Sequence, residues 1–163
     1  MEIIVDEELK DCVTEDWIKK ILSVVPSEML ENLIVRIAEP TKYWKPLSER
    51  DLIENWDRQD VQRELSKRLT MGASPKPKEV EVKVVKKAWL YYRCRRDVAR
   101  VLYHEVYHAN DLNGLDEGKR VRLSMEEYEN HPREVRARAF ERKMFQCLKG
   151  KRKLFKLKQS SES

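Results

Sequence analysis

The sequence predicts an α+β fold, because it contains one clearly alternating segment and two segments with helical periodicity. Residues 80–84 alternate valine with charged residues at strict period two, which is typical of a β-strand with one buried face. From residue 95 to about residue 110, apolar residues instead recur every three or four positions, as they do along one face of a helix. A further helix is expected from Pro132 to about residue 148, since proline is favoured in the first helical turn.

The first half of the chain is predicted to be mainly helical. Residues 14–25 carry apolar side chains at the spacing of an amphipathic helix. A short helix capped by Ser27 follows, and another polar helix is expected over residues 57–69. Between these helices, residues 34–38 form a short β-rich run. The two prolines within residues 73–78 then predict an extended connector to the alternating strand.

A second β-rich stretch follows the alternating strand. Residues 89–92 are Trp-Leu-Tyr-Tyr, and aromatic residues are enriched in strands. No Gly, Pro or Asn marks a turn between this stretch and residues 80–84. The sequence therefore leaves open whether the two stretches form one long bent strand or a hairpin.

The length and charge distribution predict one domain followed by a tail. A chain of 163 residues has room for a single domain of ordinary size, which we expect over residues 1–148, with residues 1–79 as an N-terminal helical portion and 80–148 as the functional core. Residues 149–163 hold six basic residues and one acidic residue, and so account for the whole net charge of +5. They end in Gln-Ser-Ser-Glu-Ser and are expected to be a flexible basic tail.

The composition narrows the class of protein further. A charged fraction of 39% with only nine Asn and Gln residues is typical of proteins from thermophiles. The three cysteines are not closely spaced, which fits a reducing compartment better than a disulfide framework. No apolar run reaches the length of a membrane span, and the acidic N-terminus differs from a signal peptide. We therefore expect a soluble cytoplasmic protein with no membrane partner.

The segment His104-Glu105-Val106-Tyr107-His108 carries the clearest chemical signal in the chain. Two histidines four residues apart on a helix differ by only about 40° around its axis, so both imidazoles project from one face. This spacing allows both rings to bind one Zn²⁺ ion. Glu105 projects to the side, where its carboxylate can reach a zinc-bound water and act as general base.

A catalytic zinc ion requires a third protein ligand, and its fourth coordination position is left to water. A third histidine six residues after His108, as in metzincins, is excluded because that position is a glycine. Three candidates remain, namely Asp111, His131 and Glu134. Glu134 is favoured, because it lies in the first turn of the last predicted helix, and the small Ala137 one turn later lets that helix pack closely beside the motif.

The remaining candidates have other possible roles around the metal. Asp111 follows His108 by three residues, and we expect it to orient a histidine from the second shell rather than to bind the ion. His131 and Tyr128 precede the last helix, where either could donate a hydrogen bond to a tetrahedral oxyanion. An alternative remains open, in which His131 only begins the helix and Tyr128 only packs.

With a His-Glu-x-x-His motif and a downstream glutamate, the chain resembles the gluzincin branch of zinc metallopeptidases. It is most similar to the minimal gluzincins of archaea and to similar small phage and plasmid proteins. The resemblance covers residues 80–148, whereas residues 1–79 carry no matching motif. It implies a zincin-like fold, in which a small mixed sheet packs against an active-site helix and a following glutamate helix. It also implies His104, His108 and Glu134 as ligands and Glu105 as general base and acid.

The resemblance further implies a peptide or protein substrate and an edge strand that holds it by β-augmentation. The expected edge strand carries Val80, Val82 and Val84. Minimal gluzincins are thought to be held latent by their own C-terminal segment, and the resemblance leaves open whether residues 149–163 do so here. One departure concerns Arg138, since gluzincins of the thermolysin type place an aspartate at this position.

Two other functions remain compatible with the sequence. The tail from Lys149 to Lys158 could bind nucleic acid, as basic terminal segments often do. The predicted ligands could also form a closed, purely structural zinc site. The sequence makes no prediction about the oligomeric state.

Overall fold

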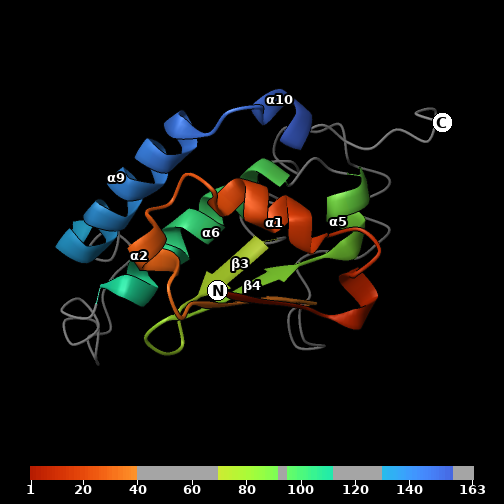
Figure 1. Ribbon diagram of the computed structural model, residues 1–163, viewed down its shortest axis with the longest axis horizontal. Coiled ribbons are helices and arrows are strands. Elements are labelled where there is room, and N and C mark those ends of the chain that lie inside the picture. Colours follow the sequence, from red (N-terminus) through yellow and green to blue (C-terminus); the bar gives the residue numbers. More distant parts are fainter. Residues whose placement is uncertain (40–69, 92–94, 112–129, 156–163) are drawn as a thin grey trace.

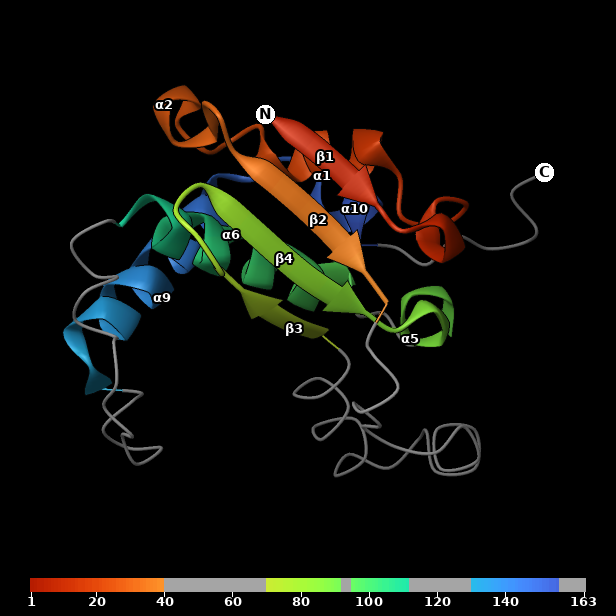
Figure 2. The same cartoon turned by 90° about the horizontal axis from the view of Figure 1, so that it is seen from below.

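The computed structural model describes residues 1–39, 70–91, 95–111 and 130–155, and Figure 1 shows their arrangement. These residues form a mixed α+β structure, as predicted, around a four-stranded sheet with the order β1-β2-β4-β3. The sheet consists of β1 (Glu2–Val5), β2 (Ile34–Ala38), β3 (Thr70–Ala73) and β4 (Glu79–Val84). β1, β2 and β4 run parallel, and β3 pairs antiparallel with β4. Figure 2 shows the four strands in this order with the helices behind them.

The connection from β1 to β2 contains a short 3-10 helix (Glu7–Leu9) and the helices α1 (Glu15–Leu22) and α2 (Ser27–Leu30). α1 confirms the amphipathic helix expected over residues 14–25, and Thr14 Oγ1 caps it by accepting a hydrogen bond from the Trp17 amide at 3.1 Å. In α2 the N-cap position is Pro26, one residue before the predicted cap. β1 and β2 also mean that residues 1–39 are not simply a helical portion.

The aromatic stretch after β4 is helical, so the expectation of a second β-rich segment is wrong for the residues described. Lys86–Tyr91 forms the short helix α5, whose Trp89 is 1% exposed. The Trp89 indole donates a hydrogen bond to the Cys12 carbonyl at 3.1 Å, and its ring meets Trp17 edge to face. The packing of Trp89 against other parts of the fold therefore outweighs the strand preference of the aromatic residues in this stretch.

Two long helices lie side by side on the same side of the sheet (Figure 1). They are α6 (Arg95–Asn110) and α9 (Pro132–Cys147), and both match the predicted ranges within one residue. The two helices are antiparallel, because residues near the end of α9 contact the beginning of α6. Ala137 of α9 is fully buried, in agreement with the predicted close approach of the two helices.

The hydrophobic core lies between the sheet and α6. Alternate residues of β4 point into it, which confirms the period-two pattern as a half-buried strand. Tyr103 of α6 is fully buried, and its hydroxyl donates a hydrogen bond of 2.6 Å to the Ile21 carbonyl of α1. α6 is therefore fixed both to the sheet and to the N-terminal helix. The fully buried residues that the sheet and α6 contribute are Val35, Ile37, Val82, Val84, Val98, Ala99, Leu102, Tyr103, Val106 and Ala109.

The position of β4 contradicts one expectation about the substrate. Val80, Val82 and Val84 lie in a strand that pairs with β2 on one side and β3 on the other, so this strand is not an edge of the sheet. In the described part of the chain, the edges are β1 and β3. The sequence could not reveal this, since β3 is only four residues long and contains a glycine.

The first half of the basic tail is not a free tail, which corrects the expectation for residues 149–155. Lys151–Leu154 forms the short helix α10, and the Trp17 indole donates a hydrogen bond of 2.9 Å to the Leu154 carbonyl. The Phe155 ring also stacks on Phe145 of α9. Residues 156–163 and the polar helix expected over residues 57–69 lie outside the described residues. Among the described helices, none has the length and apolar character needed to cross a membrane.

Candidate metal centre

α6 carries the His-Glu-x-x-His motif on the side that faces α9. The apolar stripe of this helix packs on the sheet, which leaves His104 and His108 on the neighbouring face towards the second helix. His108 is 4% exposed, whereas His104 is partly exposed. Both rings therefore project from one face of α6, as the four-residue spacing predicted, and that face lies against α9.

The first turn of α9 brings Glu134 to these histidines. His131 is the N-cap of the helix, and its Nδ1 atom accepts a hydrogen bond from the Arg133 amide at 3.2 Å. Pro132 follows in the first turn, where it lacks the amide hydrogen that would otherwise need a partner. This start places Glu134 against α6 with only 6% of its surface exposed.

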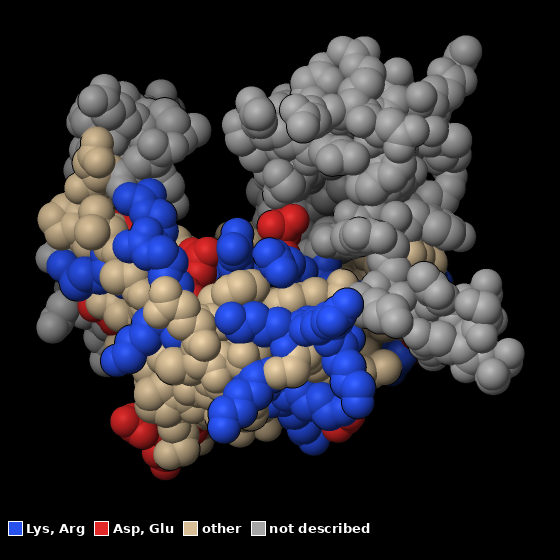
Figure 3. All heavy atoms as spheres, turned by 90° about the horizontal axis from the view of Figure 1, so that it is seen from above, with Lys and Arg blue, Asp and Glu red and all other residues tan. Residues whose placement is uncertain are grey.

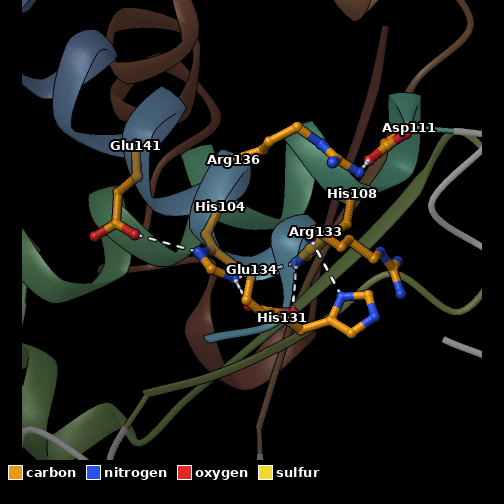
Figure 4. Close-up of polar contacts among 8 residues, drawn as sticks. All are labelled: His104, His108, Asp111, His131, Arg133, Glu134, Arg136 and Glu141. Atoms are coloured by element: carbon orange, nitrogen blue, oxygen red, sulfur yellow. Dashed lines mark hydrogen bonds and ion pairs between the residues drawn. The ribbon is translucent and has the colours of Figure 1, made fainter. Parts of the chain in front are cut away.

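Three ligand atoms converge on one point, as Figure 4 shows. Nε2 of His104 lies 2.9 Å from Oε2 of Glu134, and Nε2 of His108 lies 3.0 Å from Oε1. The two Nε2 atoms are 3.1 Å apart. A tetrahedron with metal–ligand bonds of 2.0–2.1 Å has edges of about 3.3–3.4 Å, so a few tenths of an ångström of expansion would admit an ion.

The electrostatics of the group are those of a site that holds a positive charge. Burial disfavours the charged form of His104, but hydrogen bonds with Glu134 and Glu141 outweigh burial and raise the pKa of the ring to about 9. Burial likewise acts to raise the pKa of Glu134, but hydrogen bonds from both histidines outweigh it and hold that pKa well below its usual range. The carboxylate is therefore ionised and available as a ligand.

A carboxylate that the sequence did not single out, Glu141, contacts the ligand histidine His104, whereas the role expected for Asp111 stays a prediction. Oε2 of Glu141 lies 3.2 Å from Nδ1 of His104, on the ring edge opposite the ligand atom. Asp111 instead contacts Arg136 of α9, with 3.5 Å between Oδ2 and the guanidinium (Figure 4). Nδ1 of His108 is buried without a hydrogen-bond partner among the described residues, so no described carboxylate orients this second histidine through its Nδ1 atom.

Glu105 lies beside the ligand group and against the edge strand β3. Burial raises its pKa, an effect that the nearby His104 and His108 partly offset. A Cβ atom built on Gly72 of β3 would lie only 2.7 Å from Cγ of Glu105 and 2.4 Å from Cγ1 of Val101. Only a glycine leaves room for the Glu105 side chain at this point, and the sequence alone gave no reason to single out Gly72.

Of the two predicted oxyanion donors, His131 and Tyr128, the structure describes only His131. His131 has the structural role of an N-cap, as the alternative interpretation held. If its ring is neutral, the proton lies on Nε2, because Nδ1 accepts the Arg133 hydrogen bond. Figure 4 draws a dashed contact from this ring to Arg133 and none to the ligand group. Tyr128 lies outside the described residues.

The donor set fits a divalent metal ion. Two imidazole nitrogens and one carboxylate oxygen, all within 4.8 Å of one another, form the only such group found among the described His, Cys, Asp and Glu residues. The two helices that pack on each other, α6 and α9, position all three side chains. In addition, Glu141 contacts the Nδ1 atom of His104.

Comparisons with protein-family models, curated proteins and solved structures gave no match for this chain, so the function has to be inferred from the geometry of this site.

Proposed function

We propose that the protein is a zinc-dependent metallopeptidase in which His104, His108 and Glu134 bind the ion. The observation that carries this proposal is the convergence of two Nε2 atoms and one carboxylate, with a second carboxylate, Glu105, beside them. Histidine nitrogens and a glutamate oxygen are ligands that zinc accepts in catalytic sites. Three protein ligands leave a fourth position for water, whereas structural zinc sites use four.

The bound zinc would polarise a substrate carbonyl and lower the pKa of a water molecule in the fourth position. The chain's own contribution begins with Glu105, which accepts a proton from the attacking water and returns it to the leaving amine. Its partly buried position favours such proton exchange, because a desolvated carboxylate holds a proton more readily than an exposed one. Glu141 would accept the proton of His104 Nδ1, which would leave the Nε2 lone pair of that ring available to bind an ion.

We assign the extended binding of a peptide substrate to β3 rather than to β4. β3 is the outer strand of the described sheet next to the site, and its Gly72 is exposed and directly adjoins Glu105. An edge strand offers unpaired backbone groups to a peptide in extended conformation. A peptide that pairs with β3 would therefore run past the general base. The cysteine usage further supports a cytoplasmic location as part of this proposal.

The experiment that tests the proposal compares the zinc-loaded protein with its Glu105→Gln variant. Both are incubated with a broad peptide library, and cleavage is detected by mass spectrometry. We expect cleavage by the parent protein and a loss of at least about 10²-fold in the variant, with the zinc content unchanged. Equal cleavage by both proteins, or no cleavage by the parent either as the full chain or after removal of residues 156–163, would contradict peptidase activity; the second result with zinc retained would favour a structural zinc domain.

A further inference from the structure

A group of cations converges on one pair of stacked aromatic rings, away from the metal centre. The rings of Phe145 and Phe155 are nearly parallel, with 5.5 Å between their centroids. The guanidinium groups of Arg96 and Arg100 lie 5.5 Å and 4.8 Å from the Phe145 centroid, and the Lys151 ammonium lies 4.9 Å from it. Three positive side chains from two separate helices therefore surround one ring.

The part of the tail that joins this group is fixed to the folded body. Gly150 adopts a left-handed conformation, with φ of 72°, which turns the chain between α9 and α10. The Trp17 indole then holds the Leu154 carbonyl, and the Phe155 ring covers Phe145. The basic residues of α10 are thus presented at a defined place beside α6, rather than on a flexible tether.

The surrounding surface is strongly basic. Figure 3, which views the molecule from the side of α9 and α10, shows that Lys and Arg side chains cover much of the described part of this face. The ion pairs found among the described residues do not include Arg96, Arg100 or Lys151. Asp97 is the acidic neighbour of the two arginines, and burial raises its pKa. Exposed cations on α6, α9 and α10 and the turn before α10 include Arg96, Arg100, Arg142, Lys143, Lys149, Arg152 and Lys153.

We propose that this basic surface binds the phosphate backbone of double-stranded nucleic acid. Like charges held this closely repel one another, and a polyanion relieves that repulsion with the release of condensed counterions. Arginine is suited to the role, because its planar guanidinium can donate two hydrogen bonds to one phosphate while a ring supports its face. Contacts from these cations to phosphate groups carry no information about the bases, so binding is expected to be independent of sequence.

The same surface does not fit a lipid bilayer, which is the other common polyanion in a cell. An interfacial helix needs a large exposed apolar face beside its basic residues. The large exposed hydrophobic residues of the described chain are Met1, Leu90 and Val135, none of which belongs to this cluster. Phe145 and Phe155 are partly buried and cover each other, so they are not available for insertion into lipid.

The proposal is independent of the metal centre, although the two sites share a helix. Arg100 precedes His104 by four residues, which corresponds to about 6 Å along α6. The basic surface therefore begins one helical turn from the metal ligands. The test measures nucleic-acid binding and needs no peptidase activity, so its result does not depend on whether the protein binds a metal ion.

The test measures binding of the full chain to a fluorescently labelled DNA duplex of about 20 base pairs by anisotropy, as salt is varied. The parent protein is compared with the triple variant Arg96→Gln, Arg100→Gln, Lys151→Gln. The matched control, Arg36→Gln, Lys76→Gln, Lys83→Gln, removes the same charge on and next to strands β2 and β4. We expect the triple variant to bind at least about tenfold more weakly. We also expect its salt slope to fall by about 2.7, at 0.9 for each lost phosphate contact.

Three results would overturn the proposal. These are an absence of duplex binding at low salt, an equal loss in the control variant, and tighter binding to phosphatidylserine vesicles than to the duplex at the same salt. Circular dichroism checks that each variant is folded. If the triple variant is not folded, the pair Arg152→Gln and Lys153→Gln replaces it, because both side chains are exposed on α10 and their loss leaves the aromatic stack intact. Unchanged binding by that pair would then count against the proposal.

Discussion

Glu141 and His104 form a contact in which the carboxylate oxygen lies 3.2 Å from Nδ1 of the ring, while Nε2 of the same ring lies 2.9 Å from Glu134. The two glutamates are two turns apart on α9 and hold opposite edges of one imidazole. His108 lacks such a partner among the described residues, since its Nδ1 atom is buried and unpaired. Both rings therefore contact Glu134 through Nε2, but within the described residues only His104 has a second carboxylate at its Nδ1 atom.

Replacement of Glu141 by glutamine is expected to weaken zinc binding by about 10- to 100-fold, because the amide is a weaker acceptor for the Nδ1 proton and supports the ring less firmly. Competition with a chromophoric chelator measures the affinity. The matched control is Asp111→Asn, since Asp111 forms an ion pair with Arg136 on the same helix pair. Asp111→Asn should leave the affinity unchanged. A larger effect at Asp111 than at Glu141 would reverse the assignment of the orienting carboxylate.

Metal affinity should rise with pH up to about 9 and then level off. In the metal-free protein the pKa of His104 is raised to about 9, so below this pH the ring carries a proton that a metal ion must displace. The logarithm of the affinity should therefore increase by about one unit per pH unit in that range. Glu134 adds no slope near neutral pH, because its pKa is held low and it is already ionised. Calorimetry in buffers of different ionisation enthalpy measures the released proton, and an affinity that is flat from pH 6 to about 9 would exclude a protonated ligand.

Gly72→Ala should reduce cleavage without removing zinc. The new methyl group would lie 2.7 Å from Cγ of Glu105 and 2.4 Å from Cγ1 of Val101, so either the Glu105 side chain or strand β3 must move. Overpacking of this kind costs about 1–3 kcal/mol of unfolding free energy. Chemical denaturation, zinc content and peptide cleavage are measured together. Ala73→Ser, at the next residue of the same strand, is the control, and normal activity and stability of Gly72→Ala would show that β3 does not constrain Glu105.

Trp17→Phe should release the segment that contains α10. The substitution keeps an aromatic ring beside Trp89 but removes the hydrogen bond to the Leu154 carbonyl, at a cost of about 0.5–1.5 kcal/mol. Limited trypsin digestion should then cleave faster between Lys149 and Lys153 than in the parent protein. Trp89→Phe removes a similar hydrogen bond, to the Cys12 carbonyl, and is the control. Equal protection of the tail in both variants would mean that the Trp17 contact does not hold it.

Sequence patterns predicted the elements whose signal is local. The periodicity of residues 95–110 and the first-turn proline of α9 were sufficient to place both long helices, and with them His104, His108 and Glu134. The alternation of residues 80–84 likewise located β4 and its buried face. Each of these predictions rests on the spacing of apolar or ligand residues along a single helix or strand, so one segment of the sequence is sufficient for it.

The features that the sequence did not reveal depend on segments far apart in the chain. β4 is an inner strand only because the short β3 pairs with it, and α5 is helical because Trp89 packs against Cys12 and Trp17. Glu141 reaches His104 because of how α6 and α9 pack, whereas Asp111 was favoured by its closeness to His108 in sequence alone. Residues that contact each other only through tertiary packing leave no pattern in one sequence.

The zinc content of the purified chain after dialysis shows whether His104, His108 and Glu134 form a metal site. We compare the parent protein with Glu105→Gln and Glu134→Gln, two variants in which a carboxylate near the same histidines becomes an amide. We expect one zinc ion per chain in the parent protein and in Glu105→Gln, and loss of the ion in Glu134→Gln, because Glu134 and not Glu105 belongs to the ligand group. A parent protein that binds no zinc, or a Glu134→Gln variant that retains it as firmly as the parent, would contradict the assignment of this metal centre.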